Sequence, residues 1–143
     1  TAFDCHLSDG IHNGAPTNPM LGHRVAQLAL HRIYGKGTCH DAGNICAAVR
    51  SADGKEVTLR FASVMGIVEY GLGVRAPFVF EDEQGTVAFE SMKVSLDTLT
   101  FTLSRPLAGK AYATYLYGSD FSHYFCDGAN QIPLLAFYHY EIK

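Results

Sequence analysis

The sequence predicts a mixed fold, in which a short helical N-terminal part precedes an all-β antiparallel sandwich or jelly-roll-like domain. Two observations predict this change of class. Apolar residues recur at helical spacing only near the N-terminus, whereas period-2 alternation and turn signals dominate after residue 55. The length of 143 residues suits one ordinary domain, or one small domain with part of another, and 48% hydrophobic residues suffice for a core.

A helix is expected between Asn18 and Gly35. Asn18 can cap its N-terminus, and Pro19 suits the first helical position because its missing N–H costs nothing there. Gly35 is a typical C-terminal stop. Between these signals, the apolar residues at helical spacing are Leu21, Val25, Leu28 and Ala29. The helix therefore has one apolar side, and the rest of the sequence offers no obvious α/β sheet for that side to cover.

Two segments after the helix alternate clearly between apolar and polar residues. Val57, Leu59 and Phe61 alternate with Glu56, Thr58 and Arg60, and Leu99, Phe101 and Leu103 alternate with Thr98, Thr100 and Thr102. Further strands are expected over 76–83, 86–90, 110–117 and 134–142, separated by turn signals at Asp53-Gly54, Gln84-Gly85 and Ala108-Gly109. Short strands at this spacing are typical of a sandwich or jelly roll.

These signals divide the chain into three parts. Residues 1–36 hold a Gly-rich loop and the helix, residues 37–55 are expected to be a linker that contains Gly and Cys, and residues 56–143 are expected to form the β-domain. Because the chain begins with Thr rather than Met, we expect that a segment has been removed or that this is one piece of a longer protein.

The composition excludes two classes of partner. A formal net charge of −3 with 17% charged residues gives no basic surface for nucleic acid and no polybasic patch for a membrane surface. No apolar run approaches the ~20 residues that cross a bilayer. We therefore expect neither a nucleic acid nor a membrane as partner.

The four cysteines are Cys5, Cys39, Cys46 and Cys126. Cys39 and Cys46 could close a short disulfide loop, while His40 and Asp41 between them leave a metal site as an alternative. Disulfides or free thiols are favoured over a metal, because neither C-x-x-C nor a second Cys/His pair at zinc-ligand spacing is present. No metal or other cofactor is predicted, and an extracellular, periplasmic or lysosomal location is expected.

Asp9 and His12 are the candidate catalytic residues. They lie three positions apart on a loop whose Gly10 and Gly14 permit tight turning, directly before the helix. A carboxylate that accepts the Nδ1–H of an imidazole fixes its tautomer and orientation, which makes the ring a useful general base. The spacing also arises by chance, and an Asp in a polar loop is often only a turn former, so a purely structural role remains open.

The run from Asp4 to Gly37, DCHLSDGIHNGAPTNPMLGHRVAQLALHRIYGKG, resembles the last block of SGNH (GDSL-like) hydrolases, in particular the sialate O-acetylesterase group of carbohydrate esterases. The resemblance implies that residues 1–36 end an α/β, flavodoxin-like domain, that His12 is the general base and that Asp9 orients it. FVFEDEQGTV and AYATYLYGSDFSHYFCDGANQIPLLAFYHYEI resemble the C-terminal β-domain of that family.

The family's nucleophilic Ser lies on a motif near the start of its α/β domain, and this sequence lacks that motif. The triplet Gly118-Ser119-Asp120 has the wrong order and follows a strand, so we expect a turn there. The resemblance therefore implies the C-terminal portion or processed subunit of a serine esterase that removes O-acetyl groups from carbohydrate. Its partners would be that acetylated carbohydrate and an N-terminal SGNH segment with the Ser, and the chain alone would be inactive.

A non-catalytic β-sandwich for carbohydrate binding or protein assembly is the alternative function. Aromatic residues can stack on sugar rings, and the sequence is rich in them after residue 110. Alternation favours core and cross-strand pairs for Tyr112, Tyr115 and Tyr117, while for the aromatic residues of the following loop both interpretations remain open.

Overall fold

The computed structural model describes residues 2, 4, 5, 7–37, 41–71, 76–117 and 122–143. Among them lie one helix, α1 (Asn18–Arg32), and ten strands. The strands are β1 (Asn44–Arg50), β2 (Glu56–Ala62), β3 (Ile67–Tyr70), β4 (Phe78–Asp82), β5 (Gly85–Val87), β6 (Phe89–Ser95), β7 (Thr98–Leu103), β8 (Ala111–Tyr115), β9 (Tyr124–Asp127) and β10 (Phe137–Ile142).

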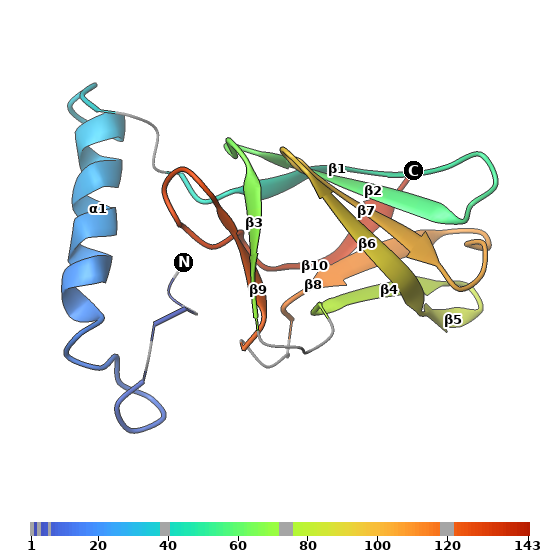
Figure 1. Cartoon of the computed structure of the whole chain (residues 1–143), viewed down its shortest axis with the longest axis horizontal. Coiled ribbons are helices and arrows are strands. Elements are labelled where there is room, and N and C mark those ends of the chain that lie inside the picture. Colours follow the sequence, from blue (N-terminus) through green and yellow to red (C-terminus); the bar gives the residue numbers. More distant parts are fainter. Residues whose placement is uncertain (1, 3, 6, 38–40, 72–75, 118–121) are drawn as a thin grey trace.

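Two four-stranded antiparallel sheets form a sandwich (Figure 1). Their strand orders are β1-β2-β7-β6 and β10-β8-β4-β5, and β3 pairs with β9 as a third, two-stranded sheet at the end nearest α1. The predicted antiparallel β-fold with one helix is therefore confirmed. Before the sandwich, the described residues form only the N-terminal loop and α1, and an α/β domain is not shown.

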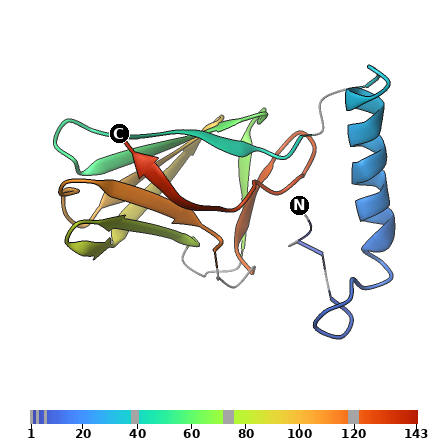
Figure 2. The same ribbon diagram turned by 180° about the vertical axis from the view of Figure 1, so that it is seen from behind.

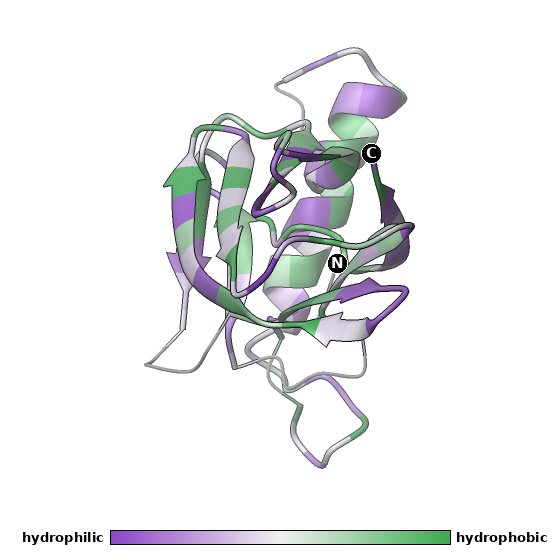
Figure 3. Cartoon of the chain, turned by 90° about the vertical axis from the view of Figure 1, so that its right-hand side faces the viewer, coloured by the Kyte–Doolittle hydropathy of each residue, from purple (hydrophilic) through white to green (hydrophobic). Residues whose placement is uncertain are grey.

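The core lies between the two larger sheets. The ring centroid of Phe101 is 4.8 Å from that of Phe78 and 4.9 Å from that of Phe80, so β7 packs directly on β4. Hydrophobic and hydrophilic bands alternate along the strands (Figure 3), as period-2 segments with one buried face require. The predicted inward residues of β2 and β7 are all at most 1% exposed: Val57, Leu59, Phe61, Leu99, Phe101 and Leu103.

Part of the expected linker at 37–55 is a strand, because β1 pairs with β2 over residues 44–50. The pairing register shifts between Ile45 and Ala47, and the buried residues of β1, Ile45 and Ala48, are three positions apart instead of two. A bulge of this kind removes the alternation on which strand prediction depends. The β-domain therefore begins before residue 56.

The strand expected over 86–90 is in fact the end of β5 and the beginning of β6, separated at Ala88. β6 continues to Ser95, and the edge position of β6 explains the weak pattern of its sequence, since its residues are half-buried or exposed throughout. Strands β3 and β9 are also absent from the predicted elements, because each has only four residues and thus too short a pattern.

Helix α1 follows the predicted span closely, with corrected ends. Thr17 rather than Asn18 is the N-cap residue, and the helix ends at Arg32. Gly35 then adopts a φ of 63°, and the Lys36 N–H donates to the Leu30 carbonyl at 2.9 Å, which closes the helix as the Gly signal predicts.

No residue of α1 is buried. The helix lies beside the β3–β9 end of the sandwich (Figure 2), and Val25 and Leu28 of its predicted apolar side are 67% and 39% exposed. The predicted apolar side of α1 is thus present, without a sheet against it among the described residues. The described part of the chain contains no helix with the length and apolar character required to cross a bilayer.

Candidate functional site

A tight loop before α1 carries the candidate catalytic pair. Leu7 and Asn13 form an isolated antiparallel bridge, which brings the two ends of the loop together. Within it, the Ser8 N–H donates to the His12 carbonyl at 2.8 Å. Gly10 has a φ of 89°, a conformation that side chains other than glycine rarely adopt, so the turn requires glycine at this position.

The Asp9 carboxylate holds both the backbone and the side chain of His12. Its Oδ1 accepts the N–H of His12 at 2.8 Å and that of Ile11 at 3.2 Å, which is the arrangement of an Asx turn. Its Oδ2 lies 2.6 Å from Nδ1 of the His12 ring. The structure therefore places the two predicted residues in the contact that an orienting acid and a base require.

The charge state of Asp9 suits this contact. The hydrogen bond with the His12 side chain, followed by those from the His12 and Ile11 backbone, lowers the pKa of the Asp9 carboxyl. An ionised Asp9 accepts the proton on Nδ1 and leaves Nε2 with its lone pair. Among the residues that the structure describes, none makes a hydrogen bond to Nε2, and the His12 and Asp9 side chains are 71% and 54% exposed.

The pair is followed directly by the start of α1. The Thr17 hydroxyl donates to the Gly14 carbonyl at 2.7 Å, and the Leu21 N–H donates to the Thr17 carbonyl at 3.0 Å. These bonds fix the loop to the first turn of the helix. The direction of the loop is thereby determined by the helix, although the Asp9–His12 contact itself depends only on residues within the loop.

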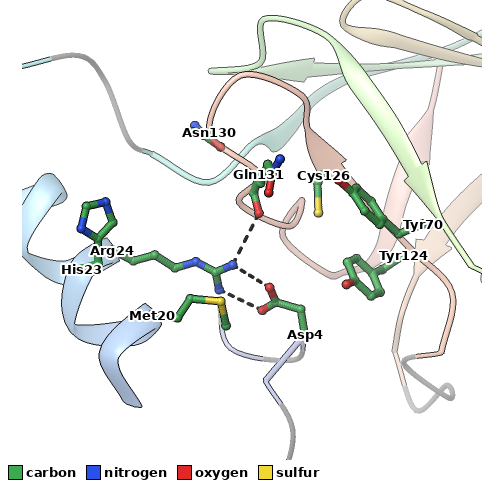
Figure 4. Close-up of a pocket in the computed structure, with 9 residues that line it drawn as sticks. All are labelled: Asp4, Met20, His23, Arg24, Tyr70, Tyr124, Cys126, Asn130 and Gln131. Carbon is green, nitrogen blue, oxygen red and sulfur yellow. Dashed lines mark hydrogen bonds and ion pairs between the residues drawn. The ribbon is translucent and has the colours of Figure 1, made fainter. Parts of the chain in front are cut away.

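The Arg24 guanidinium on α1 connects the N-terminal loop with the β-domain. Asp4 accepts two hydrogen bonds from the Arg24 guanidinium at 2.6 and 2.9 Å, and Arg24 also donates to the Gln131 carbonyl at 3.4 Å (Figure 4). No sequence signal marks this pair, because its members are 20 residues apart. It borders a hollow of about 220 Å³ lined by Asp4, Met20, His23, Arg24, Tyr70, Tyr124, Cys126, Asn130 and Gln131.

Known proteins resemble this chain in structure rather than in sequence. No family model and no curated protein matches the sequence. A solved structure, a carbohydrate acetylesterase from Xanthomonas citri, matches with a TM-score of 0.64 and 19% sequence identity. The two folds are similar. The match covers 89% of this chain and 28% of the esterase chain.

These coverages define how much of each chain is shared. Residues 44–143 make up about seven-tenths of the chain, so a match over 89% extends beyond the sandwich into residues 1–43. The chain spans little more than a quarter of the length of the esterase. The likeness therefore concerns the fold of the sandwich together with some of the residues before it.

The described cysteines are Cys5, Cys46 and Cys126, and all three are free thiols. Cys5 and Cys126 are buried, and burial raises the pKa of the Cys5 thiol and raises the pKa of Cys126 to about 12, so both stay protonated at neutral pH. Cys39 lies outside the described residues, and so does the expected Cys39–Cys46 disulfide.

Asp41, one residue of the alternative metal site in the same segment, contacts an arginine in the structure. Asp41 is bound to Arg32 through a pair of hydrogen bonds, one of them from Nε at 3.2 Å. No three Cys, His, Asp or Glu side chains gather as metal ligands in the part of the chain that the structure describes. His40 and the expected turn at Gly118-Ser119-Asp120 lie outside that part.

The aromatic residues fall into two groups. Tyr115 is fully buried, and its hydroxyl accepts the N–H of Phe125 at 2.9 Å, so its predicted core position is confirmed. Tyr112 and Tyr117 have ring contacts with His139 and Tyr138 of the neighbouring strand β10, on the outer face of the sheet. His123 and Phe125 of the following segment are buried, so they are not available as an exposed stacking surface.

Proposed function

We propose that this chain supplies the general base, His12, and its orienting acid, Asp9, to a serine esterase that removes O-acetyl groups from carbohydrate. The 2.6 Å contact between Asp9 Oδ2 and His12 Nδ1 carries the proposal. The structural likeness to a carbohydrate acetylesterase, over 89% of this chain, supports the choice of reaction by analogy of fold.

In this mechanism the nucleophile is a Ser on an α/β, SGNH-type segment that precedes the chain. His12 Nε2 removes the proton of the Ser hydroxyl as its oxygen attacks the acetyl carbonyl. The tetrahedral intermediate then collapses to an acetyl-enzyme, and the sugar oxygen leaves with the proton from His12. Water, deprotonated by the same Nε2, then attacks the acetyl-enzyme, and the Ser oxygen leaves with that proton as acetate is released, which restores the Ser hydroxyl and the neutral imidazole.

Asp9 stays ionised through the cycle and stabilises the imidazolium that forms twice. Its lowered pKa keeps it in the charged form, and its second oxygen remains bonded to the backbone, so the carboxylate cannot rotate away. Because the ring is fixed before the substrate arrives, no reorganisation of the base is needed during proton transfer.

The exposure of the pair supports a partner segment. The His12 ring is open to water on most of its surface and therefore lies in a high-dielectric medium. The apolar side of α1, which follows in the chain, is also unburied. An α/β segment packed on α1 would cover both and bring its Ser to Nε2. Acetyl-ester hydrolysis would thus require both pieces.

The test uses the complete natural gene product, assayed for acetate release from acetylated xylan and from O-acetylated sialic acid. We expect His12→Ala to remove activity on every substrate that the natural protein cleaves, and His31→Ala, on helix α1 of the same region, to leave it unchanged. Full activity in the His12→Ala protein would contradict the proposal. So would a gene that encodes no hydrolase segment before Thr1.

A further inference from the structure

The outer face of sheet β10-β8-β4 carries a row of four rings. The ring centroids of Tyr117 and Tyr138 are 4.4 Å apart, those of Tyr138 and His139 are 4.1 Å apart, and those of His139 and Tyr112 are 5.2 Å apart. The planes of Tyr138 and His139 differ by only 10°. Tyr117 and Tyr138 are 65% and 56% exposed, so this row is not part of the core.

An irregularity of the backbone creates the row. Successive side chains of a strand normally point to opposite faces, but the register of β10 shifts between Phe137 and Tyr140. His139 within this shift has a φ of 47°, in the left-handed region, and its N–H donates to the Thr114 hydroxyl at 3.2 Å. Tyr138 and His139 therefore stack side by side, in a conformation that is unfavourable for a residue other than glycine.

Carboxylates lie beside the rings. Glu81 Oε2 is 2.9 Å from Nε2 of His139, and Glu81 and Glu141 are the cross-strand neighbours of Tyr112 on the two sides of β8. The face thus combines exposed aromatic surface with hydrogen-bond acceptors, over three neighbouring strands. The pairing of Glu81 with His139 fixes both side chains and leaves Glu141 as the second acceptor.

We propose that this face binds a neutral oligosaccharide. The C–H side of a pyranose ring packs against an aromatic ring, while its hydroxyl groups donate to carboxylates at the edge of the same surface. Tyr117, at the end of the row, contacts Tyr138 on one side and remains largely exposed, so it offers the first stacking surface. An acidic saccharide fits less well, since Glu81 and Glu141 would repel it.

The face is separate from the Asp9–His12 pair, because the pair lies in the N-terminal loop before α1 and the rings lie on the β-sandwich (Figure 1). Binding there requires neither a nucleophile nor a preceding segment. The inference consequently stands whether or not the proposed esterase reaction is correct. A saccharide bound to this face would be held away from the position of cleavage.

Calorimetric titration of the 143-residue chain with neutral hexasaccharides derived from xylan, cellulose, mannan and galactan tests the inference. At least one should bind, and the double substitution Tyr117→Ala and Tyr138→Ala should weaken that binding at least about tenfold, since the stacking ring of Tyr117 and the Tyr138 ring that supports it are both removed. Glu81→Gln should weaken it about threefold to tenfold through the lost charged acceptor.

Two control variants distinguish binding at this face from binding elsewhere on the chain. Tyr34→Ala removes a tyrosine of similar exposure, 66%, outside the row and should leave the binding unchanged. Asp9→Asn should also leave it unchanged, which distinguishes the face from the proposed active site. Absence of binding to all four hexasaccharides, or undiminished binding by the double Tyr variant that is still folded by circular dichroism, would overturn the inference. Binding of a Lys-rich peptide that the same variants weaken, in place of saccharide binding, would overturn it too.

Discussion

At the scale of single residues, the two oxygens of Asp9 have separate tasks. Oδ1 accepts backbone N–H groups and shapes the turn, whereas Oδ2 meets the imidazole. An Asn at this position could keep the first task, but its amide nitrogen would donate to Nδ1 and force the proton of His12 onto Nε2. The loop would then retain its shape and lose its base.

If the proposed esterase reaction is correct, Asp9→Asn should lower kcat of the complete gene product about 10⁴-fold with little change in KM. Steady-state kinetics on an acetylated substrate measure this effect. Asp53→Asn, which changes another exposed turn Asp with a lowered pKa, is the matched control and should retain full activity. A drop of less than about tenfold for Asp9→Asn would show that His12 does not depend on this carboxylate.

A second carboxylate has a structural role. Asp82 at the end of β4 accepts hydrogen bonds from Arg105 at 2.5 and 2.9 Å and from the N–H groups of Gln84 and Ala108. The Arg105 side chain is the main cause that holds the pKa of Asp82 well below its usual range. A depressed pKa in the folded state stabilises the fold above the pKa of the unfolded state, and this contribution is lost as the pH falls.

Asp82→Asn should accordingly lower the free energy of unfolding by about 1–3 kcal/mol at pH 7. The difference from the natural protein should shrink below about pH 4, where the unfolded-state carboxyl takes up its proton. Urea unfolding at a series of pH values measures it, with Glu90→Gln on the exposed edge strand β6 as control. A difference that does not vary with pH would contradict this role of the Asp82 charge.

At the scale of elements, a buried hydroxyl of the sandwich holds the backbone of β9, whose Phe125 ring also packs on Phe78 in the core. Tyr115 of β8 accepts the N–H of Phe125, and its ring contacts Phe78 and Phe137 in the core. Desolvation raises the pKa of the Tyr115 hydroxyl, so it remains neutral at every ordinary pH. The bond thus joins a short strand, without a clear sequence pattern, to a central strand.

Tyr115→Phe should lower the free energy of unfolding by about 1–3 kcal/mol, because the buried N–H of Phe125 loses its acceptor. Chemical denaturation gives the value, and Tyr138→Phe on the exposed face should change it by less than about 0.5 kcal/mol. Equal stability of the two variants would mean that water replaces the lost acceptor.

The elements that the sequence predicts are those whose pattern one physical rule determines. In β2 and β7 a single buried face imposes strict alternation, and in α1 the Pro and Gly signals mark the ends. Strands β1 and β10 contain register shifts at Ile45/Ala47 and Phe137/Tyr140, which interrupt the alternation. Asp9 and His12 are recognisable because their contact is local, whereas the Asp4–Arg24 pair depends on tertiary structure and has no local signal.

At the scale of the whole molecule, the β-domain has its own core. Every residue of the main buried cluster lies between Ile45 and Ile142, and described contacts to the N-terminal part include the Arg24 bond to Gln131 and the Arg32 bond to Asp41. Both are polar, and Arg32 is largely exposed. An exposed ion pair such as Arg32–Asp41 adds little to stability, and the Arg24 bond to Gln131 is a single long hydrogen bond of 3.4 Å.

A fragment of residues 41–143 should therefore fold cooperatively by itself, with a free energy of unfolding within about 1 kcal/mol of that of the 143-residue chain. Circular dichroism during thermal unfolding compares the two, and the fragment should lack the helical signal of α1. A fragment without a cooperative transition would show that the sandwich depends on the N-terminal part.

The local character of the Asp9–His12 contact has a consequence for the order of folding events. All hydrogen bonds that hold the pair run between residues 7 and 13, and a loop of about ten residues closes in roughly 10–100 ns. The sandwich must instead join strands as distant as β4 and β8, a slower process. During refolding the proposed base should thus be oriented first, and the proposed esterase activity should appear at the rate at which the larger pieces come together.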